Sequence, residues 1–295
     1  MNRISKQVRM LRSRAAVTMA GLVAFVLVAG AWSPVSARPV SGPVSLGGPI
    51  SLSSVRWIFY KEDFNHLNAE APALFRQIVA SPATYILEHR EGGPPLPRQV
   101  IPAEMFFSST SLQTAIRYHR VIPGVKVVVD DLEDLGITPR VEREDPMPAM
   151  KGFGHAADSS GYRPILVPGR DLMLVSGAAC SQQRGNTISQ SYLHCDLPEA
   201  AAYSPIFVIQ AAAVETNLPA LKQLVQQAAA EARRANPHVI IFATLSVSPN
   251  GLFVNSSAVV AAAKLIRPYV QGYAMNNIRP SDPRMLQFLT GLSRG

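Results

Sequence analysis

The sequence lacks the short motifs of several large functional classes. No GxGxxG or GxxxxGK[ST] phosphate loop follows an apolar run, which argues against a nucleotide-binding fold. No serine lies in a GxSxG elbow, and no histidine shows the HExxH metal spacing. We therefore expect neither a cofactor nor a metal site.

Long apolar runs are also scarce. The uncharged run 15–30 follows five basic residues and precedes the small residues Val35, Ser36 and Ala37. It is shorter than the roughly 20 residues of a membrane-spanning helix. Residues 1–37 are therefore predicted to be a signal peptide, with an uncleaved anchor as the alternative. We expect a secreted or cell-envelope protein without a stable membrane anchor after cleavage.

Positive charge is scarce once that segment is set aside. The remaining chain of about 258 residues has 23 basic and 20 acidic residues, a net charge of +3, and no basic cluster. This argues against nucleic acid as a partner. Residues 38–54 are rich in Pro, Gly and Ser and are predicted to be an N-terminal arm. Residues 55–295 are enough for a single domain.

Cysteine is limited to Cys180 and Cys195, with 14 residues between them. Export implies an oxidising compartment, so we predict a disulfide, which would stabilise the fold by about 3 kcal/mol. A zinc site that adds His194 is the alternative, but it has no fourth ligand and no paired CxxC spacing.

What the sequence does have is a series of short apolar runs, near-continuous as in strands covered on both faces. The predicted strands are Val55–Tyr60, Ala83–His89, Glu104–Ser108, Lys126–Asp130, Pro164–Pro168, Ile206–Ala211, Val239–Thr244 and Val270–Met275, of which Ala83–His89 is the weakest.

Amphipathic segments alternate with these runs. The predicted helices are Leu74–Ala80, Thr110–His119, Met147–Asp158, Leu218–Ala235 and Asn255–Ile266, the last with Asn255 as an N-cap. The alternation predicts an α/β fold with parallel strands. We favour a (β/α)8 TIM-type barrel, regular or irregular and incomplete, over an open doubly wound sheet.

Carboxylates gather where two of these strands end, which is where a barrel places its functional groups. The period of a strand puts Asp131 and Glu133 on one side, with Asp130 opposite, toward the helical layer or a cap. Asp130 and Asp134 are expected to be solvated. Glu215 follows a later strand, and such carboxylates match the needs of glycoside hydrolysis. The alternative is that they solvate loops or cap helices.

Four segments resemble a family of secreted, largely uncharacterised actinobacterial proteins. They are VVVDDLEDLGITPRVEREDP, SPIFVIQAAAVETN, ARRANPHVIIFATLSVSPNG and VQGYAMNN, and the similarity spans about residues 120–280. The shared features are a strand that ends in Asp-x-Glu, a strand that ends in Gln, and a Gly-aromatic strand that ends in Asn.

The resemblance implies a glycosidase-like TIM-type barrel. Its cleft would contain Asp131, Glu133, Gln210, Glu215 and Asn276. Glu133 and Glu215 would be the acid and the nucleophile or base, in unassigned order. Asp131 would adjust their pKa values, and the two amides would hydrogen-bond the substrate.

This sequence departs from the family pattern at four positions. Val129, Leu135 and Ala274 stand where aromatic residues are expected, and Ala212 stands where a second Gln is expected. We therefore carry two hypotheses. The first is an exported glycosidase-like protein that hydrolyses or binds a glycan, for example of the cell envelope. The alternative is a non-catalytic secreted binding or scaffold protein on a degenerate barrel.

Overall fold

The computed structural model describes most of the chain beyond its first 47 residues. The described residues are 48–88, 95–175, 187–249, 252–276 and 282–294. The predicted signal peptide and Cys180 lie outside them, so the signal peptide and the disulfide stay predictions. Cys195 is buried.

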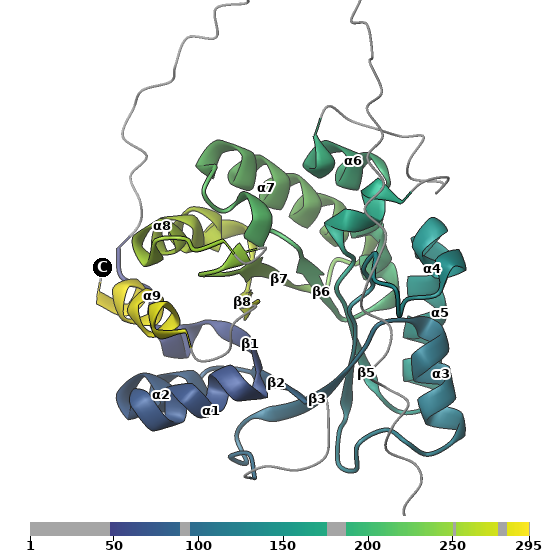
Figure 1. Ribbon diagram of the computed structural model, residues 1–295, viewed down its shortest axis with the longest axis horizontal. Helices are drawn as coiled ribbons and strands as arrows, with labels where there is room; N and C mark the ends of the chain where they lie inside the picture. The colour runs from purple at the N-terminus through teal and green to yellow at the C-terminus, as the bar shows by residue number, and fades with distance from the viewer. Residues whose placement is uncertain (1–47, 89–94, 176–186, 250–251, 277–281, 295) are drawn as a thin grey trace, which may run out of the picture. The chain divides into compact units, whose positions relative to one another are not determined.

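The strands form one closed barrel (Figure 1). They are β1 (Arg56–Tyr60), β2 (Thr84–Glu88), β3 (Ile101–Phe106), β4 (Val127–Asp130), β5 (Arg163–Leu166), β6 (Ile206–Ile209), β7 (Ile240–Leu245) and β8 (Gly272–Met275). Each strand pairs in parallel with the next, and β8 pairs in parallel with β1. The predicted (β/α)8 barrel is confirmed, and it is closed rather than incomplete.

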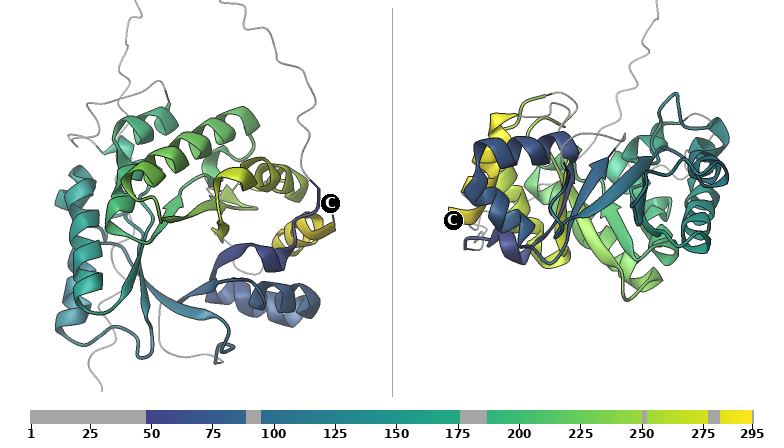
Figure 2. Two further views of the ribbon diagram at one scale, coloured as in Figure 1. Left: turned by 180° about the vertical axis from the view of Figure 1, so that it is seen from behind. Right: turned by 90° about the horizontal axis from the view of Figure 1, so that it is seen from below.

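Helices surround the barrel on its outside (Figures 1 and 2). The α-helices are α1 (Lys61–Glu70), α2 (Pro72–Val79), α3 (Ser109–Arg117), α4 (Arg140–Glu144), α5 (Pro146–Ser159), α6 (Ile188–His194), α7 (Leu218–Ala235), α8 (Ser256–Ile266) and α9 (Pro283–Arg294). Short 3-10 helices are η1 (Leu52–Ser54), η2 (Arg170–Leu174), η4 (Leu197–Tyr203), η5 (Ala212–Val214) and η7 (Arg267–Tyr269). Within the described residues, no helix has the length and apolar character needed to cross a membrane.

Most of the predicted elements are present. Helix α7 has the predicted bounds, and the side chain of Asn255 accepts a hydrogen bond from the backbone N–H of Ser257, as an N-cap does. The weak run at 83–89 contains β2, which is buried throughout. Strand β3 begins at Ile101, earlier than predicted. The prediction missed its first residues because half-buried positions and Pro102 interrupt the apolar pattern of the strand.

The barrel separates two apolar layers. Val127 and Val129 of β4 point into the barrel, where they pack with Tyr85 and Phe242, whereas Val128 packs in the layer between the strands and the helices. This alternation decides which residue beyond the end of β4 faces the mouth of the barrel.

The segment before β1 packs on the barrel. Leu52 is fully buried, and its carbonyl oxygen accepts a hydrogen bond of 2.9 Å from Nε1 of Trp57. The backbone N–H of Ile50 donates to the carbonyl oxygen of Leu292 at 2.9 Å. The described end of the predicted arm therefore belongs to the packed structure.

Candidate functional site

The strand alternation of β4 continues past its last residue. The N–H of Asp131 donates to the carbonyl oxygen of Phe106 at 2.9 Å, and the N–H of Val167 donates to that of Asp130 at 2.9 Å. The ends of β3, β4 and β5 are therefore tied together. As a result, Asp131 lies on the same side as the inward-facing Val129.

Two adjoining cavities lie at this end of the barrel. The deeper one, of about 40 Å³, is largely apolar and is lined by Ile58, Tyr60, Leu87, Met105, Val129, Asp131, Val167, Val208, Gln210, Thr244, Ala274, Met275 and Asn276. The larger one, of about 390 Å³, is lined by Glu133, Arg170, Asp171, Leu174, Ile188, Gln210, Ala212, Ala213, Thr244, Pro249 and Asn276. Because Gln210, Thr244 and Asn276 line both, the two cavities meet at these residues.

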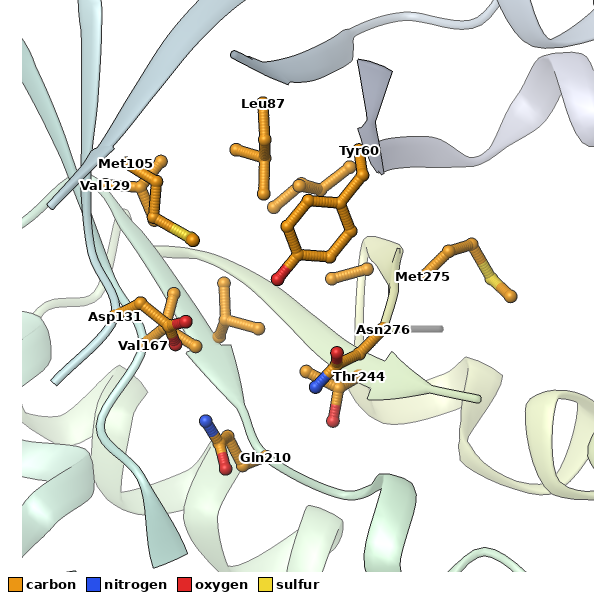
Figure 3. Close-up of a pocket in the computed structure, with 13 residues that line it drawn as sticks. Tyr60, Leu87, Met105, Val129, Asp131, Val167, Gln210, Thr244, Met275 and Asn276 are labelled. Carbon is orange, nitrogen blue, oxygen red and sulfur yellow. The ribbon is translucent and has the colours of Figure 1, made fainter. Parts of the chain in front are cut away.

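Polar side chains converge where the cavities meet (Figure 3). The hydroxyl of Tyr60, the carboxylate of Asp131 and the amides of Gln210 and Asn276 point toward a common space. These groups come from the carboxyl ends of β1, β4, β6 and β8. Four of the five predicted site residues, namely Asp131, Glu133, Gln210 and Asn276, line one or both cavities.

An amide at the end of β6 holds Glu133. Nε2 of Gln210 donates a hydrogen bond of 2.7 Å to Oε1 of Glu133. Burial raises the pKa of Glu133, while this hydrogen bond opposes the shift because it stabilises the ionised form. The backbone after β6 is fixed by Thr244, whose Oγ1 accepts hydrogen bonds from the N–H groups of Ala211 and Ala212 at 2.8 and 3.1 Å.

Asp131 has an environment that favours its protonated form. Burial raises its pKa well above the ordinary value, and the nearby carboxylates of Glu133 and Asp171 raise it further. The pKa of the Tyr60 hydroxyl is also raised. Burial is the larger cause, and the nearby Asp131 carboxylate is the next. Burial and the neighbouring carboxylates therefore favour a neutral phenol and a protonated carboxyl group in the deep cavity.

The loop after β5 adds two residues that the sequence analysis missed, Arg170 and Asp171. The N–H of Gly169 donates to the carbonyl oxygen of Leu132 at 2.7 Å, and Oδ2 of Asp171 accepts from the N–H of Asp134 at 3.0 Å. Both missed residues follow a predicted strand directly, so the same search of strand ends would have found them.

Glu215 is placed differently from the other predicted site residues. It lines neither of the two cavities and is 1% exposed. Its Oε2 accepts a hydrogen bond of 2.9 Å from the N–H of Ser246, while Oε1 is buried without a partner among the described residues. Burial raises the pKa of Glu215 to about 8.

The prediction that Asp130 is solvated is wrong. Asp130 is fully buried, and no described residue hydrogen-bonds to either carboxylate oxygen. Burial and the nearby Glu142 raise its pKa well above the ordinary value. Its orientation away from the barrel interior agrees with the alternation, but that side is covered by helices rather than by water. Asp134 is half-buried and forms an ion pair with Arg143.

Within the described ranges, no group of three or more His, Cys, Asp or Glu residues has the geometry of a metal site. In comparisons with known proteins, no family model matches the sequence, and neither does any curated protein.

Proposed function

We propose that this protein hydrolyses a glycosidic bond with Asp131 and Glu133 as its acid and its base or nucleophile. The observation that carries the proposal is the unequal environment of these two carboxyl groups at one strand end. Asp131 faces a largely apolar cavity, whereas Glu133 accepts a hydrogen bond from Gln210. Glycoside hydrolysis needs one carboxyl group that holds a proton and one that is ionised.

The roles follow from these environments. Asp131 keeps its proton and donates it to the leaving oxygen of the scissile bond. Glu133, ionised with the help of the Gln210 amide, attacks the sugar or activates water. This assignment differs from the sequence prediction, in which Glu215 was one of the two reacting groups, because Glu215 lines neither cavity.

Substrate would occupy the larger cavity, whose volume of about 390 Å³ lies within the range of roughly 300–1,000 Å³ typical of small-molecule sites. The amide of Asn276 and the hydroxyl of Tyr60 would hydrogen-bond sugar hydroxyl groups where the two cavities meet. In this proposal the substrate is a glycan whose end enters the mouth of the barrel.

The proposal is tested with a panel of chromogenic glycosides and the variants Asp131→Asn and Glu133→Gln. We expect a fall in kcat of about 100- to 10,000-fold in each variant. Glu144→Gln is the matched control, since Glu144 pairs with Arg140 on the surface and lines neither cavity. Turnover that survives both site variants at the wild-type rate would contradict the assignment.

A second candidate is a glycan-binding protein without catalytic activity. The observation that favours it is the lack of aromatic platforms: of the described residues that line the two cavities, only Tyr60 is aromatic. Sugar binding without turnover of any glycoside, and with loss of binding in Asn276→Ala, would support this function over hydrolysis.

We also propose export by a cleaved N-terminal signal, on the strength of the charged, apolar and small-residue order of residues 1–37. Mass spectrometry of protein recovered from the culture medium and cell envelope would test it. A mature N-terminus at Arg38 is the expected result, and a full-length chain retained with membranes would contradict it.

A further inference from the structure

Arg170 occupies an unusual position beside the candidate catalytic residues. It begins η2, directly after the loop that follows β5, and it lines the larger cavity together with Glu133 and Asp171. Its Nε and Nη1 atoms are buried and have no hydrogen-bond partner among the described residues. No described carboxylate forms an ion pair with it.

The neighbouring carboxylates are engaged with other donors. Oε1 of Glu133 accepts from Gln210 at 2.7 Å, and Oδ2 of Asp171 accepts from the backbone N–H of Asp134 at 3.0 Å. Buried guanidinium N–H groups without acceptors are costly, because they have lost water and gained nothing in return. An acceptor from outside the described residues would remove this cost.

A second unpartnered donor lies near Arg170. The hydroxyl of Tyr192, on α6, is buried and has no partner among the described residues. Burial lowers the pKa of Arg170, and Tyr192 is close enough to affect that pKa electrostatically. Tyr192 does not line the larger cavity, so of these two residues Arg170 is the one that can contact an oxyanion in it.

We propose that Arg170 recognises an anionic group on the substrate, so that the protein acts on an acidic sugar that carries a carboxylate or a sulfate ester. This inference rests on the proposed function, because it names the substrate class of the same site. A guanidinium matches the two oxygens of such a group with parallel N–H donors. The fixed carboxylates then contact the rest of the sugar.

The surrounding charges make Arg170 decisive for this selectivity. Among the described residues that line the two cavities, Arg170 is the only cation, whereas Asp131, Glu133 and Asp171 are all acidic. Without Arg170, the charged groups that an anionic sugar would meet in these two linings are all carboxyl groups. Removal of this residue should therefore weaken binding of acidic sugars specifically and leave binding of neutral sugars unchanged.

Calorimetric binding of matched free sugars tests this inference without turnover. The ligands are glucuronate, glucose 6-sulfate and glucose, and the corresponding galactose set. We expect the wild type to bind a uronate or a sulfated sugar more tightly than the neutral sugar. Whichever of the two acidic sugars binds more tightly shows whether the recognised group is a carboxylate or a sulfate ester. Arg170→Met should lower that affinity about ten- to hundredfold, and Arg170→Lys should lower it less.

Arg140→Met is the matched control, because it removes one positive charge from a side chain that is 75% exposed and lines neither cavity. Thermal unfolding shows whether Arg170→Met folds, and Arg170→Lys provides the comparison if it does not. Equal affinity for acidic and neutral sugars, an unchanged affinity in both Arg170 variants, or no binding of any acidic sugar would overturn the inference.

The outcomes separate this inference from the proposed function. Hydrolysis of neutral glycosides by a wild type that shows no preference for acidic sugars would overturn the acidic substrate and leave the hydrolase. Binding of an acidic sugar that depends on Arg170, without hydrolysis of any acidic glycoside, would leave the anion site and overturn the hydrolase.

Discussion

Nε2 of Gln210 and Oε1 of Glu133 lie 2.7 Å apart, although 77 residues separate them in the chain. Gln210 follows β6 and Glu133 follows β4, so β5 lies between their strands in the barrel. The bond therefore joins the loops of two strands on the same side of the mouth, and it acts on the protonation of a carboxylate that we assign to catalysis.

Replacement of Gln210 by leucine should shift the pH dependence of activity. The amide opposes the rise in the pKa of Glu133, so its loss should raise that pKa further. Because the reaction needs ionised Glu133, the acidic limb of the kcat profile should move to higher pH. Gln223→Leu, on the exposed face of α7, is the control. An acidic limb that stays in place in Gln210→Leu would show that this bond does not set the pKa.

Glu215→Gln should change how stability depends on pH. Burial raises the pKa of Glu215 from 4.5 to about 8, so the unfolded chain loses this proton at lower pH than the folded protein does. Folding of the wild type is therefore penalised as pH rises from about 4.5 to about 8, by up to a few kcal/mol. The variant lacks this penalty. Urea unfolding at pH 4 and pH 8 should show that the stability of the variant relative to wild type increases with pH.

Gly169→Ala should disturb the packing between the loops after β4 and β5. A Cβ atom at this position would lie 2.9 Å from the carbonyl oxygen of Leu132 and 3.0 Å from Cγ of Glu133. The backbone would have to shift, at a cost of about 1–3 kcal/mol, and kcat should fall with it. Gly136→Ala is the matched control, since a Cβ there has open space. Denaturant unfolding and glycoside turnover measure the two effects, and equal behaviour of the variants would contradict this account.

Glu142→Ala should destabilise the packing of α4 on α3. The carboxylate of Glu142 accepts hydrogen bonds from the N–H groups of Ser109 and Thr110 at 2.8 and 3.0 Å. Loss of these charge-assisted bonds at a helix N-terminus should cost about 1–3 kcal/mol, measured by thermal or urea unfolding. The exposed pair of Glu144 with Arg140 provides the comparison, and Glu144→Ala should cost under about 1 kcal/mol. A smaller loss of unfolding free energy in Glu142→Ala than in Glu144→Ala would contradict this stabilising role of Glu142.

The predictions that succeeded depend on local pattern. The near-continuous apolar run before Asp131 is typical of a strand covered on both faces, and the period of a strand places Asp131 and Glu133 on one side. Polar residues at the ends of parallel strands meet at one end of a barrel, which brought Gln210 and Asn276 to the same cavities. These conclusions need only neighbouring residues and the geometry of a strand.

The predictions that failed or fell short depend on what covers each side chain. Asp130 and Asp134 are both polar residues near the end of one strand, yet Asp130 is fully buried and Asp134 is paired with Arg143. Glu215 has the same local character as Glu133 but lies against Ser246 instead of a cavity. No local pattern states which helix covers a residue.

The sequence by itself determined the barrel, its parallel strands and the side of β4 that carries the acidic pair, because hydrophobic periodicity is a property of consecutive residues. Only the tertiary structure decided which carboxylates share a cavity, which amide contacts Glu133, and that Arg170 lies unpaired beside them. Those facts depend on loops from different strands meeting at one mouth, and the distances between them arise only when the barrel closes.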